Sequence, residues 1–68
     1  MKRNKLKVLR VKHELTQQQL ADKLGVSVST YNLLEMGKRD GNKELWLDIQ
    51  KLFKLEDGEV WRLINPQI

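Results

Sequence analysis

The sequence contains no cysteine, a single histidine and no long apolar run, and each absence removes a class of function. Without cysteine there is no disulfide framework and no thiolate metal site. His13 has no carboxylate at ligand spacing, so we expect it to lie in solvent, and we predict no metal and no cofactor. No segment approaches the roughly 20 apolar residues of a membrane span, and no apolar core of a secretory signal follows the basic N-terminus. The simplest interpretation is a reduced, soluble, cytoplasmic protein without a membrane partner.

The length of 68 residues allows one small domain, and we expect residues 1–68 to form it. Such a domain buries only roughly 60% of the surface that its unfolded chain exposes, so it is marginally stable alone. It has little room for a pocket of about 300 Å³, and we expect no small-molecule ligand. The sequence shows neither a nucleophile paired with a base nor a carboxylate pair, so we predict that the protein is not an enzyme.

Positive charge is concentrated in the first part of the chain. Residues 1–43 contain ten Lys or Arg against four acids, a balance of +6, whereas residues 44–68 contain three against five, a balance of −2. A basic face attracts polyanions and accelerates encounters with nucleic acid. Charge alone leaves a generic solubilising surface equally open. Residues 1–5 are predicted to be a basic arm that can lie along DNA, unless they are a frayed terminus.

The stretch TQQQLADKLGVSVSTYNLLEM, residues 16–36, predicts two short helices over 17–24 and 28–35 with a tight turn between them. Thr16 and Gln19 stand at the spacing of a capping box, which starts a helix. Gly25 stands where that helix ends, since glycine enters the left-handed conformation without steric cost. Ser27 is a good N-cap for the second helix. This combination predicts a helix-turn-helix, whose second helix can enter the DNA major groove. Its inward residues are predicted to be Leu20, Ala21, Leu24, Tyr31 and Leu34.

Three further helices complete an all-α prediction. They cover residues 4–13, 43–54 and 57–64, with Asn4, Asn42 and Asp57 as N-caps. Arg10 lies on the apolar face of the first helix and needs a partner if it is buried; Glu35 is the best candidate. The apolar faces of these helices are predicted to hold Leu6, Leu9, Trp46, Ile49, Phe53, Val60, Leu63 and Ile64.

Residues 6–39 resemble the Cro and phage-repressor type of helix-turn-helix proteins, also called the xenobiotic-response-element family. The shared pattern is L..LR....LTQ..LA..LGVS.ST...LE.GKR. The resemblance implies a compact, lambda-repressor-like bundle of four or five helices, and a bacterial, plasmid or phage origin. It also implies that Gln17 binds a DNA phosphate, that Lys38 binds backbone phosphate from a loop, and that Arg10 and Glu35 form an internal ion pair.

Two sets of DNA-contacting residues follow from this resemblance and from the position of each residue on its helix. The residues predicted to contact the DNA backbone are Gln17, Ser29, Lys38, Arg39 and Lys43. The residues predicted to contact bases are Ser27, Val28, Ser29, Asn32 and Leu33.

The second helix of the motif, predicted over residues 28–35 and called the recognition helix below, departs from the usual chemistry of such relatives. They often place Arg, Gln or Lys at the positions of Val28, Leu33 and Met36, where those side chains form bidentate bonds to bases. An apolar side chain can only touch a thymine methyl group. Three interpretations stay open: recognition of thymine methyls or of DNA shape, an apolar face that binds a protein, or inward packing of Val28 or Leu33.

The predicted function is therefore that of a sequence-specific regulator of transcription, a repressor in the simplest case. It would bind double-stranded DNA at a palindromic operator as a homodimer, with half-sites about one helical turn apart, roughly 34 Å. Residues 57–68 are predicted to form the dimer surface, through Val60, Trp61 and Ile64, unless Trp61 folds back onto the bundle. The alternative is a protein-interaction module of antitoxin or anti-repressor type that uses the apolar recognition face.

Overall fold

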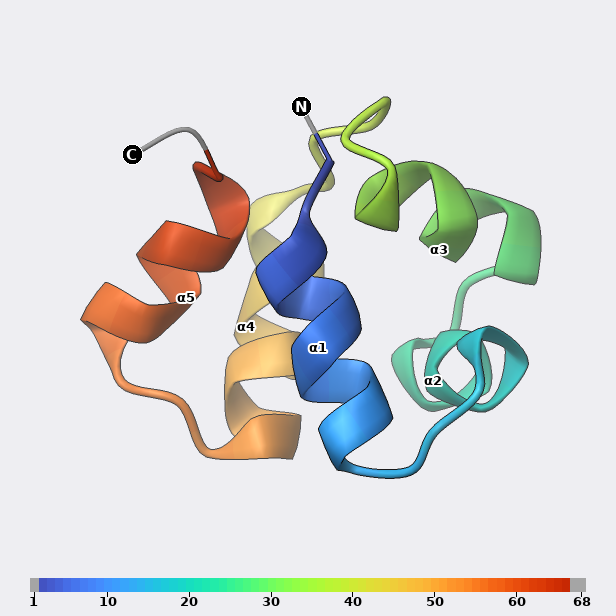
Figure 1. Cartoon of the computed structure of the whole chain (residues 1–68), viewed down its shortest axis with the longest axis horizontal. Helices are drawn as coiled ribbons and strands as arrows, with labels where there is room; N and C mark the ends of the chain where they lie inside the picture. Colours follow the sequence, from blue (N-terminus) through green and yellow to red (C-terminus); the bar gives the residue numbers. More distant parts are fainter. Residues whose placement is uncertain (1, 67–68) are drawn as a thin grey trace.

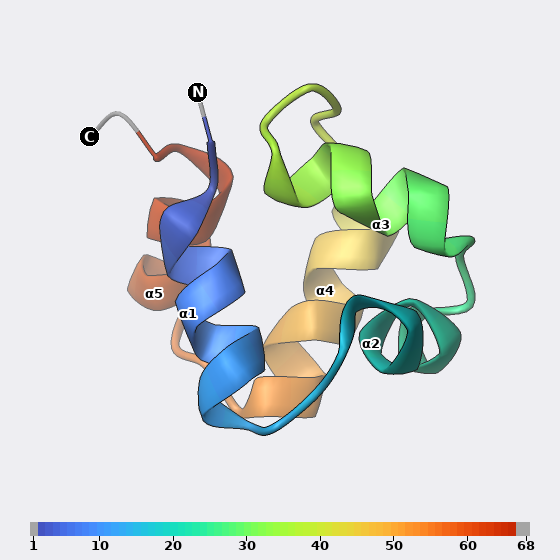
Figure 2. The ribbon, with the colours of Figure 1, turned by 45° about the vertical axis from the view of Figure 1, so that its right-hand side comes forward.

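In the computed structural model, which describes residues 2–66, the chain folds into five helices and no strand. They are α1 (Asn4–Lys12), α2 (Gln17–Leu24), α3 (Val28–Glu35), α4 (Lys43–Phe53) and α5 (Asp57–Ile64). Helices α2 and α3 lie side by side at one end of the molecule and α5 lies at the other, with α1 and α4 between them (Figures 1 and 2). None of these helices is long and apolar enough to cross a membrane. The all-α prediction is confirmed.

The predicted caps of the helix-turn-helix are present. The amide of Gln19 donates to Thr16 Oγ1 at 3.0 Å, and the amide of Thr16 donates to Gln19 Oε1 at 2.9 Å, which is the reciprocal capping box. Gly25 ends α2 in the left-handed conformation, with φ +72°. Ser27 Oγ accepts from the amide of Thr30 at 3.1 Å and starts α3. Local sequence thus fixes both ends of the turn.

Two predicted N-caps are wrong by one residue. Arg3, not Asn4, precedes α1, because the amide of Arg3 is already held by Glu35 O at 2.8 Å and its carbonyl accepts the first bonds of the helix. Glu56, not Asp57, precedes α5, and its amide donates to the Glu59 carboxylate at 3.1 Å. At both helices a hydrogen bond from the backbone amide of the capping residue sets where the helix begins, and the preference of Asn and Asp for the N-cap position does not. Asn42 does cap α4, by accepting from Leu45 N at 2.8 Å.

One hydrophobic core fills the centre of the molecule. Leu6 from α1, Leu20 and Ala21 from α2, Tyr31 from α3 and Ile49 from α4 are fully buried in it. The predicted apolar faces are therefore the ones that pack, with Leu9, Val60 and Ile64 only partly buried at the edge. The other buried apolar residues are Leu24, Leu34, Trp46, Phe53 and Leu63.

Residues 2–5 do not form a free basic arm, which corrects the prediction for the N-terminal segment. The side chain of Arg3 is buried, with 4% of it exposed, and Asn4 and Lys5 belong to α1. Met1, the remaining residue of the predicted arm, lies outside the described residues. Because Arg3 is already bonded inside the protein, it is not available to a DNA groove in this conformation.

Candidate nucleic-acid interface

A buried ion pair joins α1 to α3, the recognition helix. Arg10 Nε donates to Glu35 Oε2 at 2.9 Å, and a second guanidinium nitrogen donates to Glu35 Oε1 at 3.3 Å. The third nitrogen donates to Leu15 O at 2.8 Å, so the arginine also holds the segment that enters α2. The structure thus brings together the two residues that were expected to pair. A bidentate geometry of this kind offsets the desolvation of both charges.

The pair perturbs the ionisation of its members in a consistent direction. Burial would raise the pKa of Glu35, but hydrogen bonds from Arg10 and Gln17, the nearby hydroxyl of Tyr31 and the positive charge of Arg10 hold that pKa below its ordinary value. The hydrogen bond to Glu35 raises the pKa of Arg10. Burial raises the pKa of Tyr31, so its hydroxyl stays neutral beside the pair. The carboxylate is therefore ionised at neutral pH.

A chain of hydrogen bonds leads from this pair to the surface. Gln17 Nε2 donates to Glu35 Oε1 at 3.4 Å, and Asn32 Nδ2 donates to Gln17 Oε1 at 3.3 Å. Gln17 is the first residue of α2, and Asn32 lies in the middle of α3. The predicted phosphate-binding residue and a predicted base-contacting residue therefore touch each other, and both are anchored to the buried carboxylate.

An open hollow of about 360 Å³ lies at this junction of α1, α2 and α3. Lys2 and Lys7 border it together with Gln17, Asn32 and Met36, and both lysines are exposed. Sequence reasoning missed Lys7, although a signal existed: it stands three residues before Arg10, so it shares the face of α1 that meets α3. Two cations beside a helix N-terminus suit an anionic ligand.

The outward side of α3 is less apolar than the sequence suggested. Val28 is partly buried and packs against the core, and Met36 is only partly exposed. Of the three apolar residues Val28, Leu33 and Met36, Leu33 is the most exposed, with 36% of its surface accessible. Ser29, one turn before it, is also exposed. Inward packing therefore accounts for Val28, and the exposed recognition surface consists of Ser29, Asn32 and Leu33 with part of Met36.

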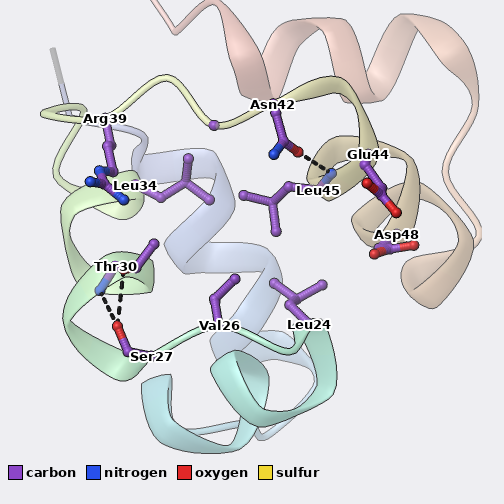
Figure 3. A pocket seen from close by; sticks show the side chains of 11 residues that line it. Leu24, Val26, Ser27, Thr30, Leu34, Arg39, Asn42, Glu44, Leu45 and Asp48 are labelled. Atoms are coloured by element: carbon purple, nitrogen blue, oxygen red, sulfur yellow. Dashed lines mark hydrogen bonds between the residues drawn. The ribbon is translucent and has the colours of Figure 1, made fainter.

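Ser27 faces a different side of the helix. Its hydroxyl accepts from Thr30 N and donates to Thr30 Oγ1 at 3.0 Å, so its single proton is already used in capping α3. Both residues border a cavity of about 660 Å³ between the helix-turn-helix and the start of α4 (Figure 3). Glu44 and Asp48 lie at the far side of that cavity, where their negative charge does not suit DNA.

The loop between α3 and α4 presents the remaining predicted backbone contacts. Lys38 and Arg39 are exposed in it, and Lys43 is exposed at the first position of α4. The loop leaves α3 through Gly37, whose φ of +75° favours glycine. The amide of Lys38 donates back to Leu33 O at 2.9 Å, which fixes where the loop begins.

Helix α5 exposes the residue that was expected to mediate dimerisation. Trp61 is 48% exposed, so it does not fold back onto the bundle. Val60 and Ile64, the other two predicted dimer residues, are partly buried and pack against the core. A half-exposed tryptophan beside two edge residues is an apolar surface on α5.

Comparison with known proteins agrees with this geometry. A family model described as helix-turn-helix matches residues 6–59. An uncharacterized HTH-type transcriptional regulator of Methanocaldococcus jannaschii is 49% identical over 57 residues, which cover 81% of this chain and 86% of that protein. No solved structure matches the chain significantly. The match to the family model includes the capping box, the turn at Gly25 and the ion pair of Arg10 with Glu35, and the chain therefore belongs to the helix-turn-helix family.

Proposed function

We propose that the protein is a DNA-binding regulator of transcription that acts as a repressor and binds a palindromic operator as a homodimer. The observation that supports this most directly is the hydrogen-bonded series from Glu35 through Gln17 to Asn32. It sets the N-terminus of α2 at a defined distance from the middle of the recognition helix. A helix-turn-helix needs such a fixed spacing, because its first helix binds a phosphate while its second helix contacts bases.

In the proposed complex, α3 enters the major groove and α2 crosses the DNA backbone. Gln17 and the free amides at the N-terminus of α2 bind one phosphate, next to Lys2 and Lys7. The loop residues Lys38 and Arg39, together with Lys43 and Ser29, bind further phosphates. These contacts give affinity and orientation but no sequence specificity.

Specificity in this proposal comes from a small set of base contacts. The side-chain amide of Asn32 can form two hydrogen bonds with adenine, and Ser29 can bond to either base type. Leu33 contacts a thymine methyl group. Val28 supports the helix from its inner side, since it packs against the core. We therefore expect operators rich in A·T pairs, helped by the shape of such DNA.

Dimerisation through α5 would place two recognition helices about one turn of DNA apart, roughly 34 Å. The half-exposed Trp61 supports this surface, because tryptophan is enriched in the core of interfaces. The α5 segment also adds acidic side chains, Glu56, Asp57 and Glu59, which suit a side turned away from DNA. A repressor of this kind acts by occupying the operator.

The test is selection of bound sequences from a random duplex pool, at a stated salt concentration, followed by anisotropy titration. We expect a palindrome to be enriched and log Kd to rise with log salt, by about one unit of slope per phosphate contact. The variant Gln17→Ala/Lys38→Ala should bind more weakly and with a smaller slope. Its matched control is Gln18→Ala/Lys51→Ala, which removes the same residue types from exposed positions elsewhere. Equal binding by both variants would refute the proposal.

The alternative of a protein-interaction module is supported by one observation, the exposed Leu33. The apolar surface it needs is smaller than expected, because Val28 packs inward. If the pool yields no enriched duplex, while Leu33→Asp abolishes capture of a protein partner by the immobilised domain, the alternative replaces the DNA-binding proposal.

A further inference from the structure

Arg3 is a buried cation that bonds to three separate parts of the chain. One guanidinium nitrogen donates to Leu34 O at 2.8 Å and to Arg39 O at 2.7 Å. The other terminal nitrogen donates to Ile64 O at 3.3 Å. These carbonyls belong to the last turn of α3, to the loop that follows it and to the end of α5. A single side chain therefore joins three segments that are distant in sequence.

The same guanidinium also lies over the ring of Trp46, which itself binds the next carbonyl of the loop. The charged carbon of Arg3 lies 5.4 Å from the ring centroid of Trp46, within cation–π distance. The indole nitrogen of Trp46 donates to Asp40 O at 2.8 Å, and the Asp40 carboxylate lies 3.7 Å from Arg3. Two successive carbonyls of the loop, those of Arg39 and Asp40, are thus held by two side chains that stack on each other.

The loop is hydrogen-bonded at its start and closely packed near its end. Gly41 adopts a φ of +73°, and a Cβ atom there would lie 3.0 Å from the indole nitrogen of Trp46 and 3.1 Å from Leu34. At its start, Lys38 N donates to Leu33 O at 2.9 Å. The backbone is therefore bonded at the start of the loop and closely packed at Gly41, while the side chains of Lys38 and Arg39 remain exposed.

We infer that Arg3 is a positioning residue of the DNA interface: its buried guanidinium holds the loop of residues 36–42 in the conformation that presents Lys38 and Arg39 to DNA phosphates. The inference rests on the proposed function. Arg3 itself makes no DNA contact, because its side chain is buried and both of its terminal nitrogens donate to carbonyls inside the protein. A loop that is ordered before binding loses less conformational entropy on association, so its two cations bind phosphate more strongly.

Arginine suits this role in a way that lysine does not. Its planar fork donates in several fixed directions at once, whereas a lysine ammonium is a single point on a flexible stem. The three donors of a lysine ammonium sit on one atom, so lysine at this position can replace the nitrogen that bonds Leu34 O and Arg39 O but not the second nitrogen that bonds Ile64 O as well. The variants Arg3→Met and Arg3→Lys should therefore both loosen the loop, Arg3→Lys by less.

The first measurement needs no DNA. Hydrogen exchange of the Trp46 indole N–H and of the Lys38 amide should accelerate roughly 10-fold or more in Arg3→Met, since a hydrogen bond to a charged group is lost at the site. The amide of Leu20, which is bonded to Thr16 O in α2, serves as the internal reference and should be unchanged. Unchanged exchange at Trp46 and Lys38, or equal acceleration at Leu20, would overturn the inference.

The second measurement is DNA binding at several salt concentrations. Arg3→Met should reduce the log–log salt slope by about one to two units, the share of the two loop cations. Lys51→Met, which removes an exposed charge from α4, should leave the slope within error. If Arg3→Met does not fold, Arg3→Lys provides the same comparison with a smaller change.

A combined variant separates positioning from a general loss of stability. In the background Lys38→Ala/Arg39→Ala, Arg3→Met should cost no further affinity, because the residues it positions are gone. If Arg3→Met lowers the affinity of this background as much as it lowers that of the wild-type protein, Arg3 does not act by positioning Lys38 and Arg39, and the inference is wrong. If the unaltered protein binds no DNA, the proposed function fails, while the exchange experiment still decides whether Arg3 orders the loop.

Discussion

Asn32 of the recognition helix donates a hydrogen bond to Gln17 at the start of α2, at 3.3 Å, so two residues with different proposed roles hold each other in place. This contact exists without DNA. The amide that we propose to contact bases is therefore already oriented in the free protein, and folding has met part of the entropy cost of ordering it.

The first prediction concerns this contact. Asn32→Ala should weaken specific binding by about 1–3 kcal/mol and relax the base preference at one operator position. Gln17→Ala should weaken binding to all sequences. The double variant should lose less than the sum of the two, because each residue positions the other. The measurement is an anisotropy double-mutant cycle, with Ser29→Ala and Gln17→Ala as the comparison pair that should be additive.

The second prediction concerns the buried ion pair. Arg10→Met should lower the free energy of unfolding by about 3–5 kcal/mol, because it leaves Glu35 buried and unpaired. Arg10→Met/Glu35→Leu should recover a large part of that loss, since no buried charge remains. Urea denaturation followed by circular dichroism measures both. Asp22→Ala, which removes the exposed contact with Gln18, should change stability by less than about 0.5 kcal/mol. Equal stabilities of the Arg10 single and double variants would contradict this account.

The third prediction is an acid transition that depends on Glu35. Its pKa in the folded protein is lowered, so the ionised form stabilises the fold above the ordinary carboxyl value of 4.5. That contribution is lost as the pH falls from 4.5 through the lower folded-state pKa, where the carboxylate takes up a proton. In Glu35→Gln this part of the pH dependence should be absent. Unfolding curves of both proteins between about pH 3 and pH 7 test it; parallel pH profiles would rule out the role of Glu35.

The fourth prediction concerns the oligomeric state. Trp61→Arg should convert the proposed dimer to a monomer with little change in helix content, because the side chain is already 48% exposed in one copy. Sedimentation equilibrium measures the association constant. Val11→Arg, at an apolar position of α1 that is 55% exposed, is the control and should leave association unchanged. A wild-type protein that stays monomeric at high concentration would place the dimer surface in doubt.

The fifth prediction concerns base preference. Leu33→Arg introduces a side chain that can bond bidentately to guanine in place of one that touches a thymine methyl. Selection from a random pool should show one position of each half-site change from T to G, with about 1–3 kcal/mol of discrimination. Thr30→Arg, on the side of α3 that borders the cavity near α4, should leave the selected sequence unchanged.

The helices and their ends were largely predictable from the sequence, because the signals that set them are local. The capping box of Thr16 with Gln19, the left-handed Gly25 and the N-caps Ser27 and Asn42 act within one turn of backbone, and the structure contains them all. The misplaced cap of α1 shows the limit of such signals, whereas the misplaced cap of α5 depends on a local contact of Glu56 with Glu59. At Arg3 a contact with α3, distant in the sequence, decided where α1 begins.

The candidate site was less predictable, because it depends on which faces of the helices meet. The family resemblance placed Val28 among the base-contacting residues and left inward packing open as an alternative, and the structure packs Val28 partly against the core. Lys7 was not predicted as a site residue, because it lies beside Gln17 and Asn32 only through the packing of α1 against α2 and α3. Contacts between helices cannot be inferred from spacing along one helix.

The sequence by itself determined the helical class, the turn at Gly25 and the pairing of Arg10 with Glu35, since a charge on an apolar face needs a partner. Only the tertiary structure decided that Arg3 is an internal anchor instead of a DNA-binding arm. Its role required three carbonyls from α3, the following loop and α5 to converge on one guanidinium. A basic residue near a chain end has no local pattern that foretells burial, because its partners are set by the packing of the whole bundle.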